Sequence, residues 1–178
     1  MQPAPQPFDS DAPLGARRAL IRRNPDDAQE TEMVEAVWGT DPRFSDGLSY
    51  RFVRSEGKSF PSHRCLIPAS EFHMTVGKRR YRVTLESGNF FYLAAVWEPA
   101  LNAWPLAYRI ITVAANPEVA QHQDRHGAII HRRQVRQWLD ATVPETDLLV
   151  TPPARTFLVE ELGARGRRMR PRQQSLAL

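Results

Sequence analysis

The pattern between residues 81 and 114 constrains the fold more than any other part of the chain. Residues 81–85 alternate apolar and polar side chains with a period of two, and the turn pair Ser87-Gly88 separates them from the apolar run 90–97. Residues 108–114 form a third run after a loop that is rich in turn-forming residues. Three neighbouring strands of an antiparallel meander are therefore predicted here.

Shorter runs elsewhere predict further strands. The first two are joined by a polar turn at residues 24–31, and Pro68 interrupts the fourth. Because proline cannot donate a hydrogen bond to a neighbouring strand, Pro68 indicates an edge or a bulge. These strands are predicted at residues 19–21, 33–38, 48–54 and 64–72.

The C-terminal part adds one helix and one further element. Residues 132–139 place Val135, Trp138 and Leu139 on one face, which is typical of a short amphipathic helix. Residues 156–162 predict a strand or a helical turn. Together the patterns predict an α+β fold, in which a mixed and antiparallel sheet curls into a barrel-like core with few short helices.

The two ends of the chain differ from its middle. Residues 1–15 contain four prolines and no hydrophobic periodicity, which predicts a flexible arm. Residues 163–178 are basic and predict a disordered tail. A single domain is therefore expected over residues 16–162.

Composition favours one domain in a reducing compartment. The chain has 178 residues, of which 42% are hydrophobic, so it can form one core of ordinary size. A single cysteine, Cys65, excludes an internal disulfide framework and a cysteine-rich zinc site. No run approaches the length of a membrane span, and the N-terminus lacks the pattern of a signal peptide. We therefore expect a cytoplasmic protein without a membrane partner.

Positive charge is carried almost entirely by arginine. The formal net charge is +4, and Lys58 and Lys78 are the only lysines. Arginine suits bidentate contact with phosphate, so its clusters favour a polyanionic partner. An arginine-rich composition also accompanies GC-rich genomes, and both explanations stay open. The clusters comprise Arg17, Arg18, Arg22 and Arg23, then Arg132, Arg133 and Arg136, and finally five arginines between residues 165 and 172.

Residues 52–74 have the most specific spacing in the chain. They contain Arg-x-Glu at 54–56 and Arg-Cys-x-x-Pro-Ala at 64–69. This segment resembles the middle of the SRAP family, the SOS response-associated proteins that crosslink themselves to abasic sites in single-stranded DNA. In that family an Asn-x-Arg-x-Glu run precedes an Arg-Cys-x-x-Pro-Ala strand that ends on a catalytic Glu.

The resemblance extends over residues 16–140. Trp38-Gly39 is similar to the family's Trp-Gly turn, and residues 110–116 are similar to its Ile-x-Thr-x-x-Ala-Asn strand and turn. The resemblance implies the SRAP fold and a protein that binds single-stranded or abasic-site DNA in a DNA-damage (SOS) context. The implied DNA-binding residues are Trp38 as a stacking platform, Arg54 and Arg125 as phosphate contacts, and also Arg64 and Asn116.

Three of these residues also have a purely structural interpretation. Arg54 and Arg125 could belong to an ion-pair network with Glu56 or Asp124, and Trp38 could be an ordinary core residue. These alternatives stay open at the level of sequence.

The resemblance also implies a reaction whose residues can be compared with this chain. The family's N-terminal cysteine forms a Schiff base through its α-amine and a thiazolidine through its thiol, with the help of an Asn, a Glu and a His. Here the chain begins Met1-Gln2-Pro3, and the other three positions hold Phe52, Met74 and Gln123. Cys65 has no free amine, and we expect it to be buried and structural. The sequence thus predicts that the catalytic residues have been lost together.

Two histidines lie close to the position of the missing one. His122 and His126 are weak substitutes, because a one-residue shift on an extended strand turns a side chain to the opposite face. Their i,i+4 spacing is also found in metal sites, but no third ligand follows at a suitable spacing. We expect neither a metal nor another cofactor.

Three hypotheses follow. The leading one is an SRAP-like protein that binds single-stranded or damaged DNA without efficient thiazolidine crosslinking. The second is a non-enzymatic structural or protein-interaction module of mobile-element origin, whose pocket is plugged by Phe52 and Met74. The third and weakest is a different hydrolase that uses Glu71, His73 and His122.

Overall fold

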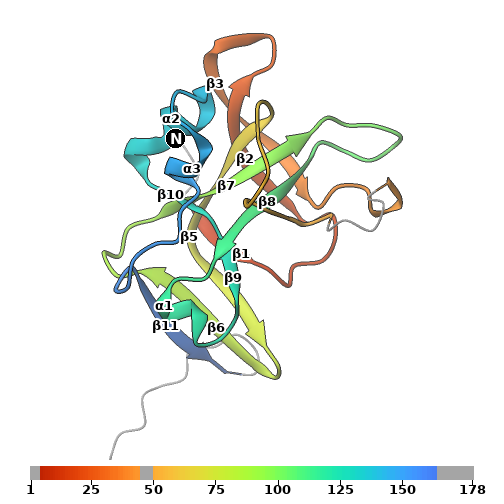
Figure 1. Cartoon of the computed structure of the whole chain (residues 1–178). Helices are drawn as coiled ribbons and strands as arrows, with labels where there is room; N and C mark the ends of the chain where they lie inside the picture. Colours follow the sequence, from red (N-terminus) through yellow and green to blue (C-terminus); the bar gives the residue numbers. More distant parts are fainter. Residues whose placement is uncertain (1–4, 45–49, 164–178) are drawn as a thin grey trace, which may run out of the picture.

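A mixed sheet of 11 strands dominates the computed structural model, which describes residues 5–44 and 50–163 (Figure 1). Three short α-helices and two 3-10 turns complete it: η1 (Pro42–Phe44), α1 (Pro117–Ala120), η2 (Arg132–Gln134), α2 (Val135–Asp140) and α3 (Glu145–Leu148). The strands are β1 (Gln6–Asp9), β2 (Arg17–Asn24), β3 (Asp27–Trp38), β4 (Phe52–Arg54), β5 (Arg64–Val76), β6 (Arg79–Leu85), β7 (Phe91–Glu98), β8 (Ala107–Ala114), β9 (Arg125–Gly127), β10 (Ile129–Ile130) and β11 (Phe157–Leu162).

Five of the strands close into a ring. β7 pairs with β8, β8 with β3, β3 with β2, β2 with β5, and β5 returns to β7. Only the β3–β8 pairing in this ring is parallel. The predicted mixed and antiparallel sheet, curled into a barrel-like core, is confirmed.

β5 is long enough to pair with different strands along its two halves. Its first half pairs with β7 inside the ring, and its second half pairs with β6, which in turn pairs with β11. On its other side, pairing with β2 ends at Leu66 and pairing with β1 begins at Ala69. Pro68 lies in this gap, where a missing backbone N–H costs no hydrogen bond on that side. The irregularity predicted at Pro68 is therefore present.

The predicted meander is wrong in its first pairing. β7 and β8 pair antiparallel as predicted, but β6 pairs with β5 and β11 and not with β7. The reason is the tight turn between β5 and β6, where Gly77 has a φ of 61° and Val76 faces Arg79. In this hairpin β5 pairs with one edge of β6, so that edge is not available to β7. The chain leaves β6 through a turn at Gly88, whose φ is 77°.

The N-terminal segment is not wholly a loose arm. β1 pairs in parallel with β5, and Phe8 is buried in the main core. Arg18 holds this strand in place, since its guanidinium donates to the carbonyls of Pro7 and Gln6 in β1 and of Pro68 in β5. The burial of one aromatic side chain therefore overrides the proline-rich composition that predicted an arm. Residues 1–4 lie outside the described residues.

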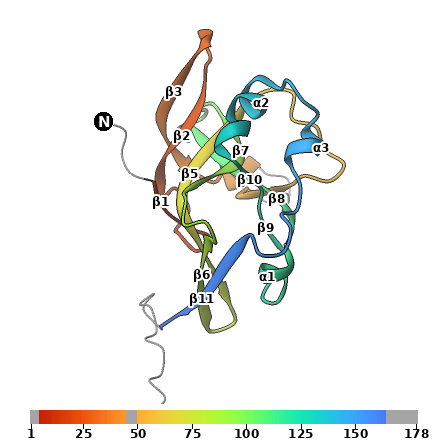
Figure 2. The ribbon, with the colours of Figure 1, turned by 90° about the vertical axis from the view of Figure 1, so that its left-hand side faces the viewer.

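The first hairpin is also longer than predicted. The turn expected at residues 24–31 is shorter in the structure, because β2 runs to Asn24 and β3 begins at Asp27. Figure 2 shows this hairpin extending beyond the rest of the sheet. The helix predicted at 132–139 is confirmed as η2 followed by α2, and residues 157–162 are a strand. The predicted tail at 163–178 lies, apart from residue 163, outside the described residues.

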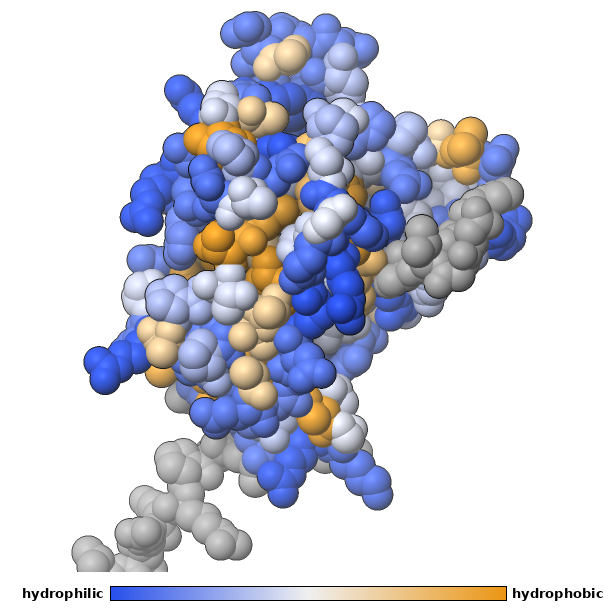
Figure 3. Space-filling model, viewed as in Figure 1, coloured by the Kyte–Doolittle hydropathy of each residue, from blue (hydrophilic) through white to orange (hydrophobic). Residues whose placement is uncertain are grey.

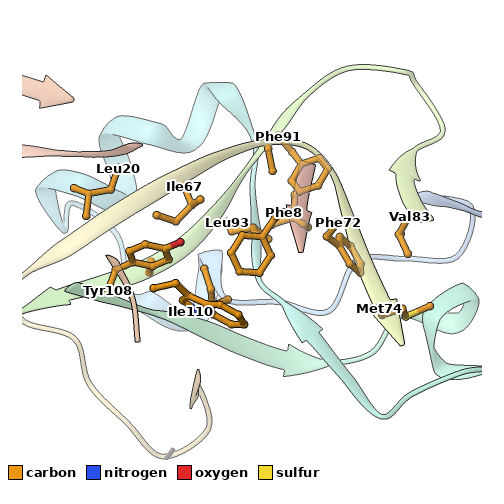
Figure 4. Packing of buried hydrophobic residues seen from close by; sticks show 14 of the residues in the cluster. Phe8, Leu20, Ile67, Phe72, Met74, Val83, Phe91, Leu93, Tyr108 and Ile110 are labelled. Atoms are coloured by element: carbon orange, nitrogen blue, oxygen red, sulfur yellow. The ribbon is translucent and has the colours of Figure 1, made fainter. Parts of the chain in front are cut away.

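Two clusters of buried side chains stabilise the sheet from its two faces. The larger contains Leu20, Ile67, Phe72, Phe91 and Leu93, and several of its members are drawn in Figure 4. The smaller is centred on Trp138 of α2, whose indole N–H donates to the carbonyl of Cys65 at 2.9 Å. Within residues 5–44 and 50–163, no helix is both long and apolar enough to cross a membrane.

Candidate functional site

A cavity of about 440 Å³ lies beside the ring, between β1, β4, β5, β8 and β9. The strand register explains which residues meet there. Phe52 of β4 lies opposite Ile110 of β8, and Arg54 lies opposite Thr112 of β8, which in turn faces Gly127 of β9. Alternate residues of a strand point to the same side of the sheet. These five residues of β4, β8 and β9 therefore line the same cavity.

The floor of the cavity is apolar. Phe8, Phe52, Phe72, Leu93 and Ile110 contribute their side chains to it. Phe52 occupies the family's Asn position, yet it does not fill the space in front of it. The cavity is therefore open above an apolar floor, which differs from the plugged pocket of the second hypothesis.

Gly127 keeps this floor open. A Cβ atom at this position would lie 2.8 Å from Cδ2 of Leu93 and 3.1 Å from Cγ2 of Ile110. Both separations are shorter than ordinary carbon–carbon contacts. A larger residue here would therefore displace the cavity wall.

The rim carries two arginines with different surroundings. The Arg125 guanidinium binds both carboxylate oxygens of Glu56, at 3.0 and 2.8 Å, and also donates to the hydroxyl and carbonyl of Thr112. The Arg125 guanidinium holds the pKa of Glu56 below its usual value, so this pair is charged at neutral pH. The Arg54 side chain is exposed and makes no hydrogen bond or ion pair with the described residues, although it is close enough to Glu56 to help lower the pKa of that carboxyl. One of the two arginines is thus locally neutralised and the other is available to an anion.

Gln123 is the residue that the resemblance aligns with the family's catalytic His. Its side chain lines the cavity, and its amide nitrogen donates to the carbonyl of Arg125 at 2.8 Å. A carboxamide has no basic nitrogen at neutral pH, so this residue can donate and accept hydrogen bonds but cannot move a proton as imidazole does.

The two neighbouring histidines do not replace it. His126 also lines the cavity, but its Nε2 accepts the backbone N–H of Asn116 at 3.2 Å and its Nδ1 lies 2.8 Å from the carbonyl of Gly127. This places the proton on Nδ1, and burial lowers the pKa of His126, so the ring is neutral. His122 instead packs against the ring of Tyr81, 4.2 Å away, and does not line the cavity.

Met74 lies apart from this site. It is buried near the C-terminal end of β5, two residues after Phe72, and it faces Tyr81 of β6 (Figure 4). Its side chain belongs to the main core and is not among the residues that line the cavity. Of the three substituted family positions, the structure brings Phe52 and Gln123 together and places Met74 separately.

Three residues that the resemblance associates with DNA are held inside the protein. Trp38 is 1% exposed and packs edge-on against Phe8 and Phe52. Arg64 donates to the carbonyls of Phe60 and Trp138 and to the carboxylate of Glu145. Asn116 is fully buried and caps the start of α1 through the backbone N–H of Val119. In this conformation none of the three presents a side chain to a DNA strand.

Cys65 is fully buried in β5. Burial raises the pKa of its thiol well above its usual value, and this keeps the sulfur protonated. The expectation that Cys65 is buried agrees with this position.

The cavity also contains two polar residues that the sequence patterns did not single out, Ser10 and Asp11, together with His73 of the third hypothesis. Ser10 and Asp11 follow β1, and His73 lies on β5. Nε2 of His73 lies 2.5 Å from the carboxylate of Glu71, and Nδ1 lies 3.2 Å from the guanidinium of Arg80. Both ring nitrogens are therefore occupied, and His122 is elsewhere, so the hydrolase arrangement of the third hypothesis does not assemble. Only the pairing of β1 with β5 brings Ser10 and Asp11 here, and no local sequence signal marks it.

The parts of the chain that the structure describes hold no cluster of three or more His, Cys, Asp or Glu side chains placed to bind a metal ion. Figure 3 shows one face of the molecule, which is mainly hydrophilic with hydrophobic residues gathered toward its centre.

Comparisons with known proteins agree with this architecture. The structure is similar to a crystal structure of a protein from Bordetella bronchiseptica, with a TM-score of 0.64 and 23% sequence identity over 89% of this chain and 91% of the other. A crystal structure of a protein from Bacteroides thetaiotaomicron gives a TM-score of 0.62 and 17% identity over 83% and 74% of the two chains. These likenesses show the fold alone, and no curated protein matches the sequence significantly.

The family comparison is more direct. The family model described as SOS response associated peptidase (SRAP) matches residues 11–162, which include every strand from β2 to β11. The chain therefore belongs to the SRAP family.

Proposed function

We propose that this protein binds single-stranded or abasic-site DNA at the mouth of the cavity, in a DNA-damage context, without efficient thiazolidine crosslinking. The observation that carries the proposal is an open cavity that brings together Phe52 and Gln123, two positions that the resemblance implies are catalytic in the family, with Arg54, which forms no ion pair with the described residues, on its rim.

Binding is supported by the charge and shape of the rim. Arg54 has no carboxylate partner within the described residues and can contact a phosphate without first losing an ion pair. The Phe52 and Phe72 side chains behind it offer apolar surface to a sugar or an unstacked base. Arg125 contributes less, because Glu56 already compensates its charge.

Loss of the crosslinking reaction is supported by the groups that replace the reactive ones. The family reaction, as the resemblance implies it, needs a carboxylate and an imidazole near the abasic aldehyde. Here a buried thioether stands at the first position and a carboxamide at the second, at Met74 and Gln123. Neither group exchanges a proton at neutral pH, so neither provides the acid–base step.

The first experiment measures binding by fluorescence anisotropy with a labelled single strand that carries one abasic site. We expect saturable binding that weakens steeply with salt, because phosphate contacts release counterions. Arg54→Gln should weaken binding and reduce the slope of log K against log salt by about 0.7. Arg17→Gln is the matched control, since Arg17 is exposed and paired with Glu35 outside the cavity. Salt-independent binding, or none, would remove the DNA-binding proposal.

The second experiment tests the reaction with the same strand. The protein and the abasic strand are incubated, heated and separated on a denaturing gel, next to an identical strand without the lesion. We expect no heat-stable adduct with either strand. A robust adduct with the abasic strand alone would contradict the loss of crosslinking.

The apolar floor favours a second candidate function. A non-enzymatic interaction module would use Phe52, Phe72 and Ile110 to receive an apolar side chain of a protein partner. This candidate predicts that Phe52→Asn abolishes partner binding, and that neither Arg54 nor salt matters for it. A strong effect of Arg54→Gln on DNA binding would favour the first candidate.

A further inference from the structure

A second concave surface, distinct from the cavity, lies where three separate segments meet. It has a volume of about 740 Å³ and no lining residue in common with the cavity. Its walls come from the end of β6 and the following turn, from the segment after β10, and from the segment before β11. We call it the basic groove; it is lined by Leu85, Glu86, Ser87, Asn89, Phe90, His131, Arg132, Arg133, Arg155 and Thr156.

The arginines of the basic groove differ from most others in the protein. Arg132, Arg133 and Arg155 are exposed and have no carboxylate partner among the residues that the structure describes. Glu86 is the one carboxylate in the lining of the groove. Elsewhere the rule is pairing, as for Arg17, Arg22, Arg23, Arg43, Arg64, Arg79, Arg80, Arg82, Arg109 and Arg125. Three of the described arginines that form no ion pair therefore line this one groove.

The segment that carries Arg155 is fixed in place. Its backbone adopts a φ of 69°, which is rare for a residue with a side chain and persists only where the surroundings enforce it. The carboxylate of Glu118 accepts the backbone N–H of Phe157 at 3.0 Å, and the Thr156 hydroxyl donates to the carbonyl of Pro153 at 2.7 Å. Arg155 is thus held at the groove before any ligand arrives.

The opposite wall combines a cation with an aromatic ring. The guanidinium of Arg132 lies over the ring of Phe90, 5.0 Å from its centroid, and Phe90 packs edge-on against Tyr92. Cation–π contact orients Arg132 along the wall while leaving its N–H groups free to bind an anion. Ser87, Asn89 and Thr156 add neutral hydrogen-bonding groups around it.

We propose that the basic groove binds phosphate groups of a single nucleic-acid strand, at a site separate from the cavity. Three uncompensated arginines from two walls suit a chain of phosphates better than a single carboxylate ligand. The aromatic wall suits a sugar or base between the phosphates. The groove and the cavity lie on different faces of β7, because Leu93 of the cavity belongs to the main core, whereas Tyr92, which contacts Phe90, packs against the smaller cluster. Binding in the groove does not require binding in the cavity.

A residue-resolved titration separates the two sites. Amide ¹H–¹⁵N spectra of the full chain are recorded while a short single-stranded oligothymidylate is added. We expect saturable shifts at residues 86–90, 131–133 and 155–156, which line the groove. Shifts confined to residues that line the cavity, such as 123–127, would overturn the groove and leave the proposed function standing. Shifts confined to the groove would support the groove and contradict DNA binding at the cavity. An unchanged spectrum would contradict binding at both places.

Inorganic phosphate at the same phosphate concentration is the second arm of this titration. A strand offers several linked phosphates, so it should saturate the groove at a lower concentration than free phosphate does. Equal midpoints for the two ligands, or shifts with inorganic phosphate alone, would contradict a site for a strand.

Charge variants then measure the contribution of the groove. Arg132→Gln combined with Arg155→Gln should lower the slope of log K against log salt for the oligonucleotide by about 1.4, the value for two phosphate contacts. The control combines Arg17→Gln with Arg79→Gln, which removes the same charge from two exposed, ion-paired arginines outside the groove. Glu86→Gln should tighten binding. Equal losses in both double variants, or weaker binding after Glu86→Gln, would overturn the proposal.

Discussion

At the scale of single residues, the availability of an arginine depends on the charges around it more than on its position in a motif. Arg54 and Arg125 both match the family pattern, yet Arg125 is bound by Glu56 through two hydrogen bonds, whereas the Arg54 side chain forms no ion pair with the described residues, although the charge of Glu56 lies nearby. Arg64 matches as well, but it is 8% exposed and bonded inside the protein. The sequence motif treats these three arginines alike, and only the folded structure shows that their surroundings differ.

Glu56→Gln should therefore strengthen DNA binding. The change removes the bidentate partner of Arg125 and one negative charge near Arg54, while the side chain keeps its shape. We expect the Kd for a single strand at low salt to fall by a factor of about 3 to 10, as for one additional phosphate contact. Anisotropy titration measures it, with Glu35→Gln as a control that also releases an arginine, Arg17, but away from the cavity. Unchanged affinity would show that Arg125 takes no part in binding.

Arg64→Met tests the structural role of the buried arginine. The guanidinium binds the carbonyls of Phe60 and Trp138 and the carboxylate of Glu145, so its loss leaves buried acceptors unpaired. We expect the free energy of unfolding to fall by about 3 kcal/mol, measured by urea denaturation. Arg54→Met, at an exposed position in the same motif, should change it by less than about 0.5 kcal/mol. Equal effects of both substitutions would contradict this assignment.

At the scale of secondary structure, the elements predicted from the sequence are those that local patterning determines. Residues 132–139 form a helix because their apolar side chains repeat with helical spacing and bury Trp138. The pairing of β6 could not be read in the same way, because it depends on the distant and unusually long β5. β1 was missed because its stability comes from one buried phenylalanine, Phe8, and not from any repeat.

The candidate site also contains some residues that the sequence predicts and others that only the packed structure reveals. The spacing of the family motif led to Phe52 and Gln123, and the structure places both in one cavity. It could not reveal that Trp38 is enclosed between Phe8 and Phe52, because burial is a property of the packed molecule. Nor could it reveal Ser10 and Asp11, which reach the cavity only through the pairing of β1 with β5.

One prediction belongs to the contact between α1 and β11. Burial raises the pKa of Glu118, but hydrogen bonds from the backbone N–H groups of Phe157 and Arg155 and from the Asn116 amide outweigh it, so the pKa is lowered overall. A lowered pKa stabilises the fold above the unfolded-state value near 4.5, and this contribution is lost as the pH falls through the folded-state pKa.

Glu118→Gln should accordingly destabilise the protein by about 1 kcal/mol at pH 7 and progressively less below about pH 4. Urea denaturation across this range measures the difference, and Glu30→Gln, on the exposed start of β3, is the control. A difference that does not change with pH would mean that the carboxylate charge is not involved.

At the scale of the whole molecule, β5 connects every part of the sheet. It closes the ring through β7 and β2 and carries β6 and β11 on its second half. It also contributes Leu66 to the smaller buried cluster and Ile67 to the larger one. Without β5 the ring would open, and the paired strands β6 and β11 would lose their link to it.

This connection predicts a single cooperative unfolding transition. Far-ultraviolet circular dichroism reports on the sheet, and tryptophan fluorescence reports on the four tryptophans, of which Trp38 and Trp138 lie in the two clusters. Both signals should give the same urea midpoint. Separate midpoints would indicate that β6 and β11 unfold independently of the ring.

The position of Gln123 has a consequence for how such a protein can change over time. It lies in the segment between α1 and β9, outside the closed ring, and its side-chain amide makes one hydrogen bond, to the carbonyl of Arg125. Replacing this side chain alters what the cavity can do while every strand pairing of the ring is kept. The closed ring and the lining of the cavity can therefore diverge at different rates, so that the residues that line the cavity can change without a new fold.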